Sequence, residues 1–367
     1  MVDPVAAMGL VRQGGIDAVV VDLLLPGNAG MGLLRTLLES SPSTLRIGLT
    51  TGSERQTVQQ AGAPVHQLLA KPCDPTVLKA ILARAFAARE LSGHDALQAL
   101  VDKVTSLPVL PQIYIAVTDE LKSEDPSLER VGEIVAKDMA LTAKILQLAN
   151  SAFFGLGRRI THPAEAAIFL GVETLKAMVL SLQVFAQFQH LKLTRFNVEN
   201  LWTHSWATGV LARRLCEYEE LSRTITDESF IAGLLHDVGK LVVASNFPQG
   251  MDDTMAQAEQ NKLALWEQEC RTWGVSHDEV GGYLLGRWGL PKGVVEAVAF
   301  HHRPALARNQ SFSALTAVHV ANTLGKLHPS TSGIPCQTVD LDYLRSLELA
   351  GRVDGWREMF LEASRKK

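Results

Sequence analysis

Residues 233–240 read Gly-Leu-Leu-His-Asp-Val-Gly-Lys, and they place a histidine and an aspartate side by side in an apolar setting. The surrounding segment, residues 230–243, has helical periodicity, so His236 and Asp237 are expected on one helix. An imidazole nitrogen and a carboxylate oxygen can together hold a divalent metal ion. This stretch predicts a helical region with a candidate metal centre.

The helical pattern continues through most of the chain after about residue 90. Proline and glycine separate the apolar segments, and no convincing strand pattern occurs there. We expect an all-α region over about residues 97–325, followed by a loop at 328–333 and one or two further helices. The clearest helical segments are 128–136, 140–149, 164–188, 201–217 and 230–243.

Residues 16–86 have a different pattern, in which short apolar runs alternate with helical stretches. The runs at 17–21, 45–49 and 67–70 are expected to be strands, and the first is rich in β-branched residues. Strands that alternate with helices indicate a parallel sheet. The last helix of this region is expected to present an apolar face formed by Leu78, Ile81, Leu82 and Phe86.

Composition and charge limit the classes of protein to which this chain can belong. The chain has 367 residues, 47% of them hydrophobic and 20% charged, which is typical of globular proteins with more than one domain. The net charge is −4 and no long basic run occurs, so nucleic-acid binding is not expected. The four cysteines are scattered and fit a reducing compartment. No apolar run approaches the ~20 residues of a membrane span, so we expect a cytoplasmic protein.

Three polar residues are expected at the ends of the N-terminal strands. Asp22 ends the first strand, Thr50 closes the second and Lys71 follows the third. The carboxyl ends of parallel strands meet at one edge of a sheet, where open α/β sheets assemble their sites. A carboxylate nucleophile, a hydroxyl and a lysine at such an edge suit phosphoryl transfer.

With Pro26, Gly30 and Pro72, this ordered set resembles the response-regulator receiver family over about residues 5–86. The resemblance implies that Asp22 is the phospho-acceptor, that Thr50 and Lys71 complete its pocket, and that a sensor kinase or a downstream regulator is a partner. Receivers have an earlier strand that ends in an acidic pair, which binds Mg²⁺. Only twenty-one residues precede Asp22, too few for that strand and the helix and strand after it.

We therefore expect a truncated receiver without a Mg²⁺-binding site, in which small phosphodonors phosphorylate Asp22 slowly or not at all. The strand at 18–21 would also lack its usual neighbour, which leaves unpaired backbone groups along one side. Two outcomes are expected for that edge: self-association into a homodimer, or packing against the helical region.

Several short strings after residue 100 resemble the HDOD family, a signalling branch of the HD phosphohydrolase superfamily, over residues 103–304. The resemblance implies an all-α fold that serves as a regulatory output module, often joined to receivers. The strings are Leu107-Pro-Val-Leu-Pro111, Leu148-Ala-Asn-Ser-Ala-Phe-Phe-Gly155, Leu201-Trp-Thr-His-Ser205, residues 233–240, Gly274-Val-Ser-His-Asp-Glu-Val-Gly281, Arg287-Trp-Gly-Leu-Pro291 and His301-His302.

Five histidines and one aspartate occupy the positions that an HD-type metal centre uses. Neutral imidazoles with one carboxylate suit Zn²⁺, Fe²⁺ or Mn²⁺, and a hydrogen-bonded core histidine is the alternative for each residue alone. We expect His204, His236, Asp237 and His277 to converge within about 5 Å, because bonds of ~2.0–2.2 Å to one ion require it. His301 and His302 are expected on the rim of the same cavity. The six residues are His204, His236, Asp237, His277, His301 and His302.

Catalysis is not expected, and no catalytic residue is assigned. HD enzymes that cut cyclic dinucleotides carry Gly-Tyr-Pro after the paired histidines, whereas Arg303-Pro304-Ala305 follows here. Asn322 stands where the superfamily has its closing aspartate, and its neutral carbonyl is a poorer ligand. Two alternatives stay open: a metal-dependent HD-type phosphohydrolase or phosphodiesterase, and a structural scaffold with an inactive receiver.

The expected organisation is a truncated α/β receiver-like domain followed by an all-α HD-related domain. The boundaries are 1–88 for the receiver, 89–102 for a linker, 103–305 for the HDOD domain and 306–367 for a C-terminal helical extension. The expected function is two-component-type signal transduction, in which the output domain binds a protein or a small ligand such as a nucleotide.

Overall fold

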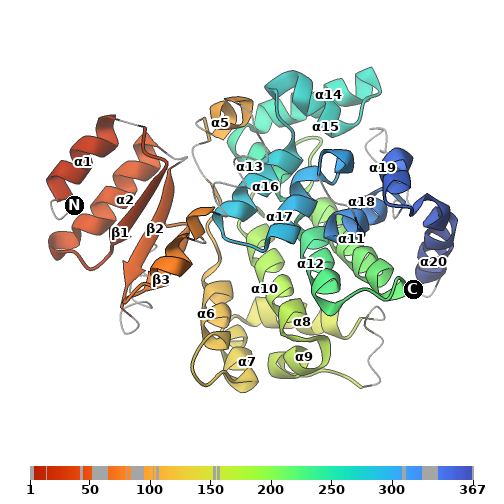
Figure 1. Cartoon of the computed structure of the whole chain (residues 1–367), viewed down its shortest axis with the longest axis horizontal. Helices are drawn as coiled ribbons and strands as arrows, with labels where there is room; N and C mark the ends of the chain where they lie inside the picture. Colours follow the sequence, from red (N-terminus) through yellow and green to blue (C-terminus); the bar gives the residue numbers. More distant parts are fainter. Residues whose placement is uncertain are drawn as a thin grey trace.

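The computed structural model describes residues 4–13, 15–41, 44–51, 65–79, 81–83, 95–101, 103–104, 107–151, 154, 158–307, 311–324 and 338–365. Phe86, residues 89–94 of the expected linker and the expected loop at 328–333 lie outside these residues. The described chain forms a small α/β module and a larger helical part (Figure 1). The predicted fold class is confirmed.

The sheet of the α/β module is parallel, as predicted, with the order β1 (Ala18–Asp22), β2 (Leu45–Thr50), β3 (Gln67–Ala70). Helices α1 (Pro4–Gln13) and α2 (Ala29–Ser40) pack over one face, and the helical residues 75–79 and 81–83 pack over the other. The short helix η1 (Pro26–Asn28) joins β1 to α2. Covering both faces of a parallel sheet buries its apolar side chains.

β1 forms one edge of the described sheet, since it pairs only with β2 there. The hydrogen bond from the sheet to the helical part comes instead from Gln67 of β3, at the opposite edge. Figure 1 likewise shows β3 between β1 and the helical part. The expectation that the β1 edge packs against the helical region is therefore wrong, because β3 occupies that position; self-association stays a prediction.

Everything from residue 95 onward is helical or connecting in the described residues. No described helix is long and apolar enough to cross a membrane. The helices are α5 (Asp95–Val101), α6 (Gln112–Leu121), α7 (Leu128–Ala136), α8 (Met139–Ala149), α9 (Pro163–Leu170), α10 (Val172–Ala186), α11 (Val198–Tyr218), α12 (Arg223–Leu235), α13 (Val238–Asn246), α14 (Pro248–Asn261), α15 (Leu265–Trp273), α16 (His277–Arg287), α17 (Lys292–Phe300), η2 (Pro304–Leu306), α18 (Ala314–Leu324), α19 (Leu341–Ser346), η3 (Ala350–Arg352) and α20 (Val353–Arg365).

Polar side chains fix where several helices begin. Ser127 accepts a hydrogen bond from the Arg130 amide at the start of α7, and Asp138 accepts one from the Leu141 amide at the start of α8. These contacts satisfy backbone N–H groups that a first helical turn leaves without partners. The segments predicted at 128–136 and 140–149 consequently match α7 and α8 closely.

Two segments predicted as single helices are each divided. Residues 164–188 form α9 and α10, which separate at Gly171, where φ is +90° and a side chain would be strained. Residues 230–243 span α12 and α13, which separate at His236 and Asp237. The second break puts the metal-centre candidates at a helix junction instead of on one helix face.

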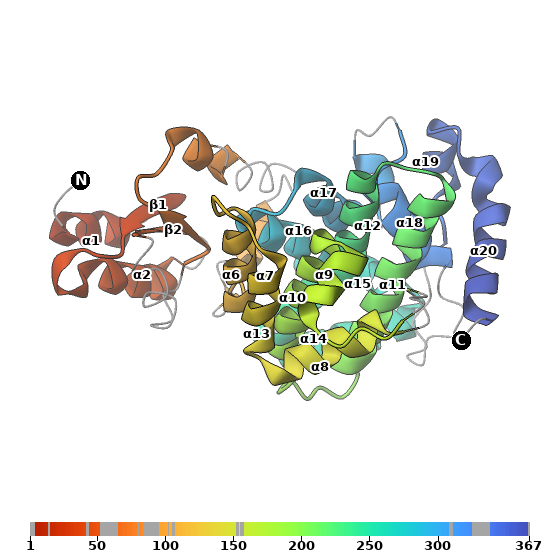
Figure 2. The ribbon, with the colours of Figure 1, turned by 90° about the horizontal axis from the view of Figure 1, so that it is seen from below.

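One hydrophobic core extends from α5 to α20. α5 lies in the segment expected to be a linker, yet Leu97, Leu100 and Val101 are buried in that core. At the other end, α20 lies on the side of the helical part remote from the sheet (Figure 2). Trp356 of α20 is fully buried, and its indole N–H donates to Glu219 at 2.7 Å.

The α/β module contacts the end of α16. The side-chain amide of Gln67 donates to the backbone carbonyl of Arg287 at 2.9 Å. Arg46 and His66 are buried beside it, and the Arg46 amide donates to Nδ1 of His66 at 2.9 Å. Burial and the charges of Arg287 and Arg46 hold the pKa of His66 well below its usual range, so this imidazole is neutral.

This neutral histidine predicts a pH effect on stability. An unfolded histidine titrates near pH 6.5, so below that pH the unfolded state binds a proton that folded His66 does not. The contribution of neutral His66 to the free energy of unfolding is therefore fully present above pH 6.5. Below that pH the free energy of unfolding falls, by up to about 1.4 kcal/mol per pH unit. His66→Asn, which keeps an acceptor for the Arg46 amide, should flatten this dependence.

The measurement is urea unfolding of the full chain between pH 7.5 and 5, followed by a probe placed in the sheet. His190→Asn is the matched control, because His190 is exposed. The other buried histidines contribute equally to the pH dependence of unfolding in every variant. An unchanged slope in His66→Asn would show that folding does not lower the pKa of His66.

Candidate metal centre

The helical junction at His236 and Asp237 lies where several helices meet. Asp237 precedes α13, yet its side chain makes no helix-capping hydrogen bond and instead faces the histidines. His204 comes from α11, His277 is the first residue of α16, and His301 and His302 directly follow α17. Residues nearly a hundred positions apart in the sequence thus surround one carboxylate.

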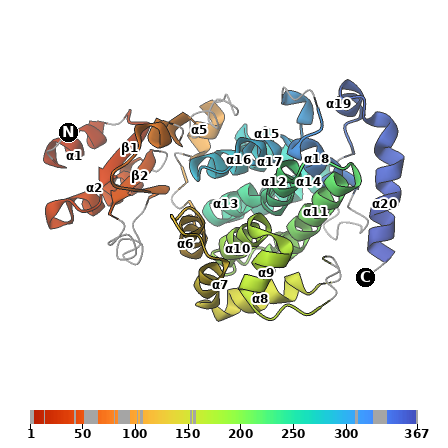
Figure 3. The same cartoon turned by 60° about the horizontal axis from the view of Figure 1, so that its bottom comes forward.

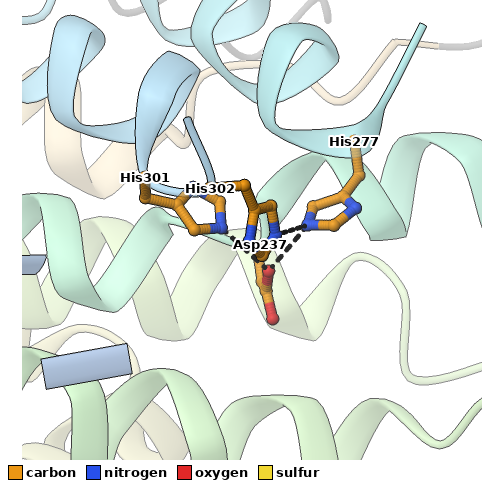
Figure 4. A group of neighbouring side chains, drawn as sticks. All are labelled: Asp237, His277, His301 and His302. Carbon is orange, nitrogen blue, oxygen red and sulfur yellow. Dashed lines mark hydrogen bonds and ion pairs between the residues drawn. The ribbon is translucent and has the colours of Figure 1, made fainter. Parts of the chain in front are cut away.

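One oxygen of that carboxylate faces three histidines (Figure 4). Oδ1 of Asp237 lies 3.2 Å from Nε2 of His277 and 3.8 Å from Nε2 of His301. Nε2 of His302 lies 3.0 Å from Nε2 of His277. The ligand atoms of these four residues all lie within 4.8 Å of one another, and all four side chains are buried.

The other oxygen faces a second group. Oδ2 of Asp237 lies 3.4 Å from Nε2 of His236 and 3.8 Å from Nε2 of His204. Those two imidazole nitrogens are 3.2 Å apart, and Oδ1 of Asn322 lies 3.1 Å from His204. The Lys240 ammonium also donates to Oδ2 at 2.7 Å. Asp237 therefore belongs to both groups.

The outer ring nitrogens are held by acceptors, which fixes the tautomers. Nδ1–H of His236 donates to the Gly233 carbonyl at 2.8 Å, and Nδ1–H of His301 donates to the Val298 carbonyl at 2.9 Å. Nδ1–H of His277 donates to the Glu269 carboxylate at 2.5 Å. A carbonyl or carboxylate on the far nitrogen is the usual support of a metal-binding histidine, since it leaves the Nε2 lone pair facing the ion.

Burial and charge set the protonation states. Burial lowers the pKa of His236 to about 4 and holds those of His301 and His302 well below their usual range. Burial also disfavours the charged form of His277, but the Glu269 and Asp237 carboxylates raise its pKa to about 9. Despite burial, the nearby charges of His236, Lys240 and His277 hold the pKa of Asp237 well below its usual range.

The residues fit a divalent ion. Oδ1 of Asp237 and Nε2 of His301 are buried and have no hydrogen-bond partner among the described residues, although they face each other. Leaving such atoms unsatisfied is costly, and a cation between them would satisfy both. Ligand atoms at ~2.0–2.2 Å from one ion lie about 3–3.5 Å apart, close to the separations found here. Imidazole and carboxylate ligands suit Zn²⁺, Fe²⁺ or Mn²⁺.

The arrangement differs from the expected one in two respects. His204, His236, Asp237 and His277 do not form a single group; Asp237 divides the residues into two. His301 and His302, expected on the rim, are buried in the interior, because α17 ends against α16 and directs both rings inward.

Three supporting residues had not been singled out. Lys240 lies one helical turn after Asp237, a spacing that could have indicated it. Glu269 has no local signal, since only the packing of α15 against α16 brings it to His277. His319 holds the backbone: its Nδ1–H donates to the His301 carbonyl at 2.8 Å, and its Nε2 accepts from the Asp340 amide at 2.9 Å.

The receiver residues lie at the expected edge of the sheet. Lys71 follows β3 and forms an ion pair with Asp22 at the end of β1. This lysine lowers the pKa of the Asp22 carboxyl, and the Leu24 amide, which donates to it at 3.0 Å, adds to the effect. Thr50 ends β2 and is fully buried. Asp22 and Lys71 are thus brought together, beside the end of the strand that carries Thr50.

Comparisons with known proteins agree with this architecture. The HDOD domain family matches residues 107–304, more than half of the chain, and the response regulator receiver domain family matches residues 1–83. A protein of Treponema pallidum is 29% identical over 224 residues, which are 61% of this chain and 43% of that protein. A Bacillus subtilis protein is 29% identical over 94 residues, 26% of this chain and 20% of its own length. This chain thus spans less than half of either relative.

Solved structures show the same fold. An HDOD domain protein from Geobacter sulfurreducens is 24% identical, with a TM-score of 0.53, over 76% of this chain and 98% of that one. A candidate phosphohydrolase from Shewanella amazonensis is 22% identical, with a TM-score of 0.54, over 74% of this chain and 95% of that one. With the family match over most of its helical part, this chain belongs to the HDOD domain family, and its N-terminal receiver domain makes it a signal-transduction protein.

Proposed function

We propose that this chain relays a signal from its receiver to its HDOD domain through direct contacts, without turning over a substrate. The connection between β3 and α16 carries the proposal. At one end of β3, Lys71 binds Asp22; at the other, Gln67 binds the carbonyl of Arg287, the last residue of α16. The first residue of α16 is His277. A change at Asp22 would thus act on β3 and, through it, on α16, which begins at His277 of the candidate metal centre.

In this proposal Asp22 is the phospho-acceptor, Thr50 and Lys71 complete its pocket, and a sensor kinase or downstream regulator is the partner. The domain boundaries at 88 and 305 are part of the proposal, whereas α5, in the segment expected to be a linker up to 102, packs in the core of the helical part.

The HD-like centre supports a role other than turnover. Asp237, His277 and His301 are buried, and Lys240 already binds one oxygen of the carboxylate. Catalytic metal sites keep a position open for water or substrate, whereas structural sites are closed by protein ligands. His204, His236, Asp237, His277, His301 and His302 would hold a Zn²⁺, Fe²⁺ or Mn²⁺ ion. Such an ion would supply Lewis acidity, and the burial of every one of these residues except His204 favours a structural use of it.

The same donor set favours a second candidate, a metal-dependent phosphohydrolase, because a divalent ion held by imidazoles and a carboxylate would activate water. Hydrolysis of nucleoside phosphates or cyclic dinucleotides by the metal-loaded protein would establish that activity. The burial of Asp237, His277 and His301, together with Asn322 in place of an acid, leads us to expect no hydrolysis.

The relay predicts a change in α16 when Asp22 is altered. Asp22→Asn removes the charge that binds Lys71, so amide hydrogen exchange near Arg287 should increase several-fold. Gln67→Ala should cause a similar increase, and the double variant should add little, because both changes act through one connection.

Mass spectrometry of exchanged peptides from the full chain measures this effect. Glu39→Gln, an exposed carboxylate on α2, is the control and should leave α16 unchanged. If Asp22→Asn alters exchange in β1 and β3 but not in α16, the two domains are not coupled and the scaffold alternative is favoured.

A further inference from the structure

A second site lies away from the metal centre. A cavity of about 730 Å³ opens between α8, α10, the connecting segment 187–197 and the first turns of α11. These helices lie close together in Figure 3. Ligand pockets typically have volumes of roughly 300–1,000 Å³, so this cavity can enclose a small organic molecule.

One wall of the cavity is aromatic. Phe185 and Trp202 pack edge to face, with ring centroids 5.2 Å apart, and both line the cavity. Leu141, Leu182 and Phe196 extend this apolar surface. Aromatic faces with aliphatic neighbours favour a flat apolar ligand, which buries its area against them.

The polar part of the lining has an available positive charge. Of the acidic residues there, Asp138 is already engaged: it accepts hydrogen bonds from the Leu141 amide at 2.9 Å and from the Gln183 side chain at 2.8 Å. Lys144 and Lys192 also line the cavity, and neither side chain forms an ion pair or a hydrogen bond with a described residue. Glu199 is exposed in the first turn of α11, where the helix dipole favours its charge.

The cavity is also connected to the HD-like centre. Trp202 contacts Trp206, with ring centroids 6.1 Å apart, and Trp206 contacts Phe230 of α12 at 5.9 Å. α11 carries His204, and His236 directly follows α12. A molecule bound against Trp202 therefore lies on the helix that supplies one residue of the centre.

We propose that this cavity binds a small organic anion with a flat aromatic body. The ring system would lie against Phe185 and Trp202, and the anionic group would face Lys144 and Lys192. This inference deepens the proposed relay, because it names the class of ligand that the HDOD domain binds. The signalling role of that ligand rests on the proposed function, whereas its binding does not.

Two dyes that differ in one group test the proposal on the full chain. 8-Anilinonaphthalene-1-sulfonate has the flat body and an anion, and N-phenyl-1-naphthylamine has the same rings without the sulfonate. By fluorescence titration, the sulfonate should bind with a stoichiometry of one. The double change Lys144→Met and Lys192→Met should weaken it about tenfold, as expected for a lost charge-assisted contact. The affinity of this double variant for the neutral dye should change less than twofold.

Ala186→Trp, at an exposed position of the wall, should fill the cavity and remove binding of both dyes. Lys122→Met, an exposed lysine after α6, is the control, and near-ultraviolet circular dichroism checks that each variant is folded. The proposal is overturned if the sulfonate does not bind, if the lysine variant binds it normally, or if Ala186→Trp retains it. Each of those results leaves the exchange test of the relay intact, because that test uses no ligand.

Discussion

Gly239→Ala should lower the melting temperature of the helical domain by roughly 6–12 °C. Gly239 lies in the first turn of α13, and a Cβ there would stand 1.9 Å from the His277 carbonyl oxygen and 2.8 Å from the Gly281 amide. Both contacts are with backbone, so α13 and α16 would have to separate. Forcing an extra carbon into a packed core costs about 3 kcal/mol, and a domain of this size loses about 2–4 °C per kcal/mol.

The same displacement would move His277 away from Asp237, so metal affinity should fall with stability. Gly250→Ala on α14 is the matched control: its nearest contacts would be 3.6 and 3.7 Å away, and alanine is the better helix former. Differential scanning calorimetry measures both variants. A melting temperature within 2 °C of the wild type for Gly239→Ala would mean that α13 and α16 are less closely packed than described.

The fold followed from local signals to a large extent. Strand ends at Asp22, Thr50 and Lys71 were visible because apolar runs stop at polar residues, and parallel topology then requires those ends to meet. The segments at 128–136 and 140–149 were visible from their helical periodicity, and the structure adds that Ser127 and Asp138 cap α7 and α8. Such features depend on neighbours within a few residues in the chain.

The centre could be predicted only as a set of residues. The resemblance to a family supplied the histidines, but their division by Asp237 depends on how α11, α16 and α17 approach the α12–α13 junction. Glu269 and Gly239 had no signal in the sequence, because each acts across two helices. Periodicity also missed the break at His236 and Asp237, since a continuous apolar run hides a change of helix direction.

Asp237→Asn is expected to lower the affinity of the metal-free protein for Zn²⁺, Fe²⁺ or Mn²⁺ by at least about 100-fold. The change keeps the volume of the side chain but removes the carboxylate shared by both histidine groups. Loss of a supporting residue alone typically costs 10–100-fold in affinity, so loss of the shared ligand should cost more. It also leaves Lys240 without its buried counter-charge and His277 with Glu269 alone, which should cost about 3–5 kcal/mol of stability.

Asp278→Asn separates loss of the site from general destabilisation. Asp278 is equally buried and follows His277, but its carboxylate faces Ser276 and Arg303, so this variant should lose stability and still bind metal. Each protein is stripped with a chelator, reloaded with one metal at a time, and measured by elemental analysis and calorimetric titration. Equal metal loss in both variants would mean that binding only reports folding. The loaded wild type is then assayed against nucleoside phosphates and cyclic dinucleotides. Turnover that Asp237→Asn abolishes and Asp278→Asn retains would replace the relay with the phosphohydrolase, because Asp237 faces the histidines and Asp278 does not.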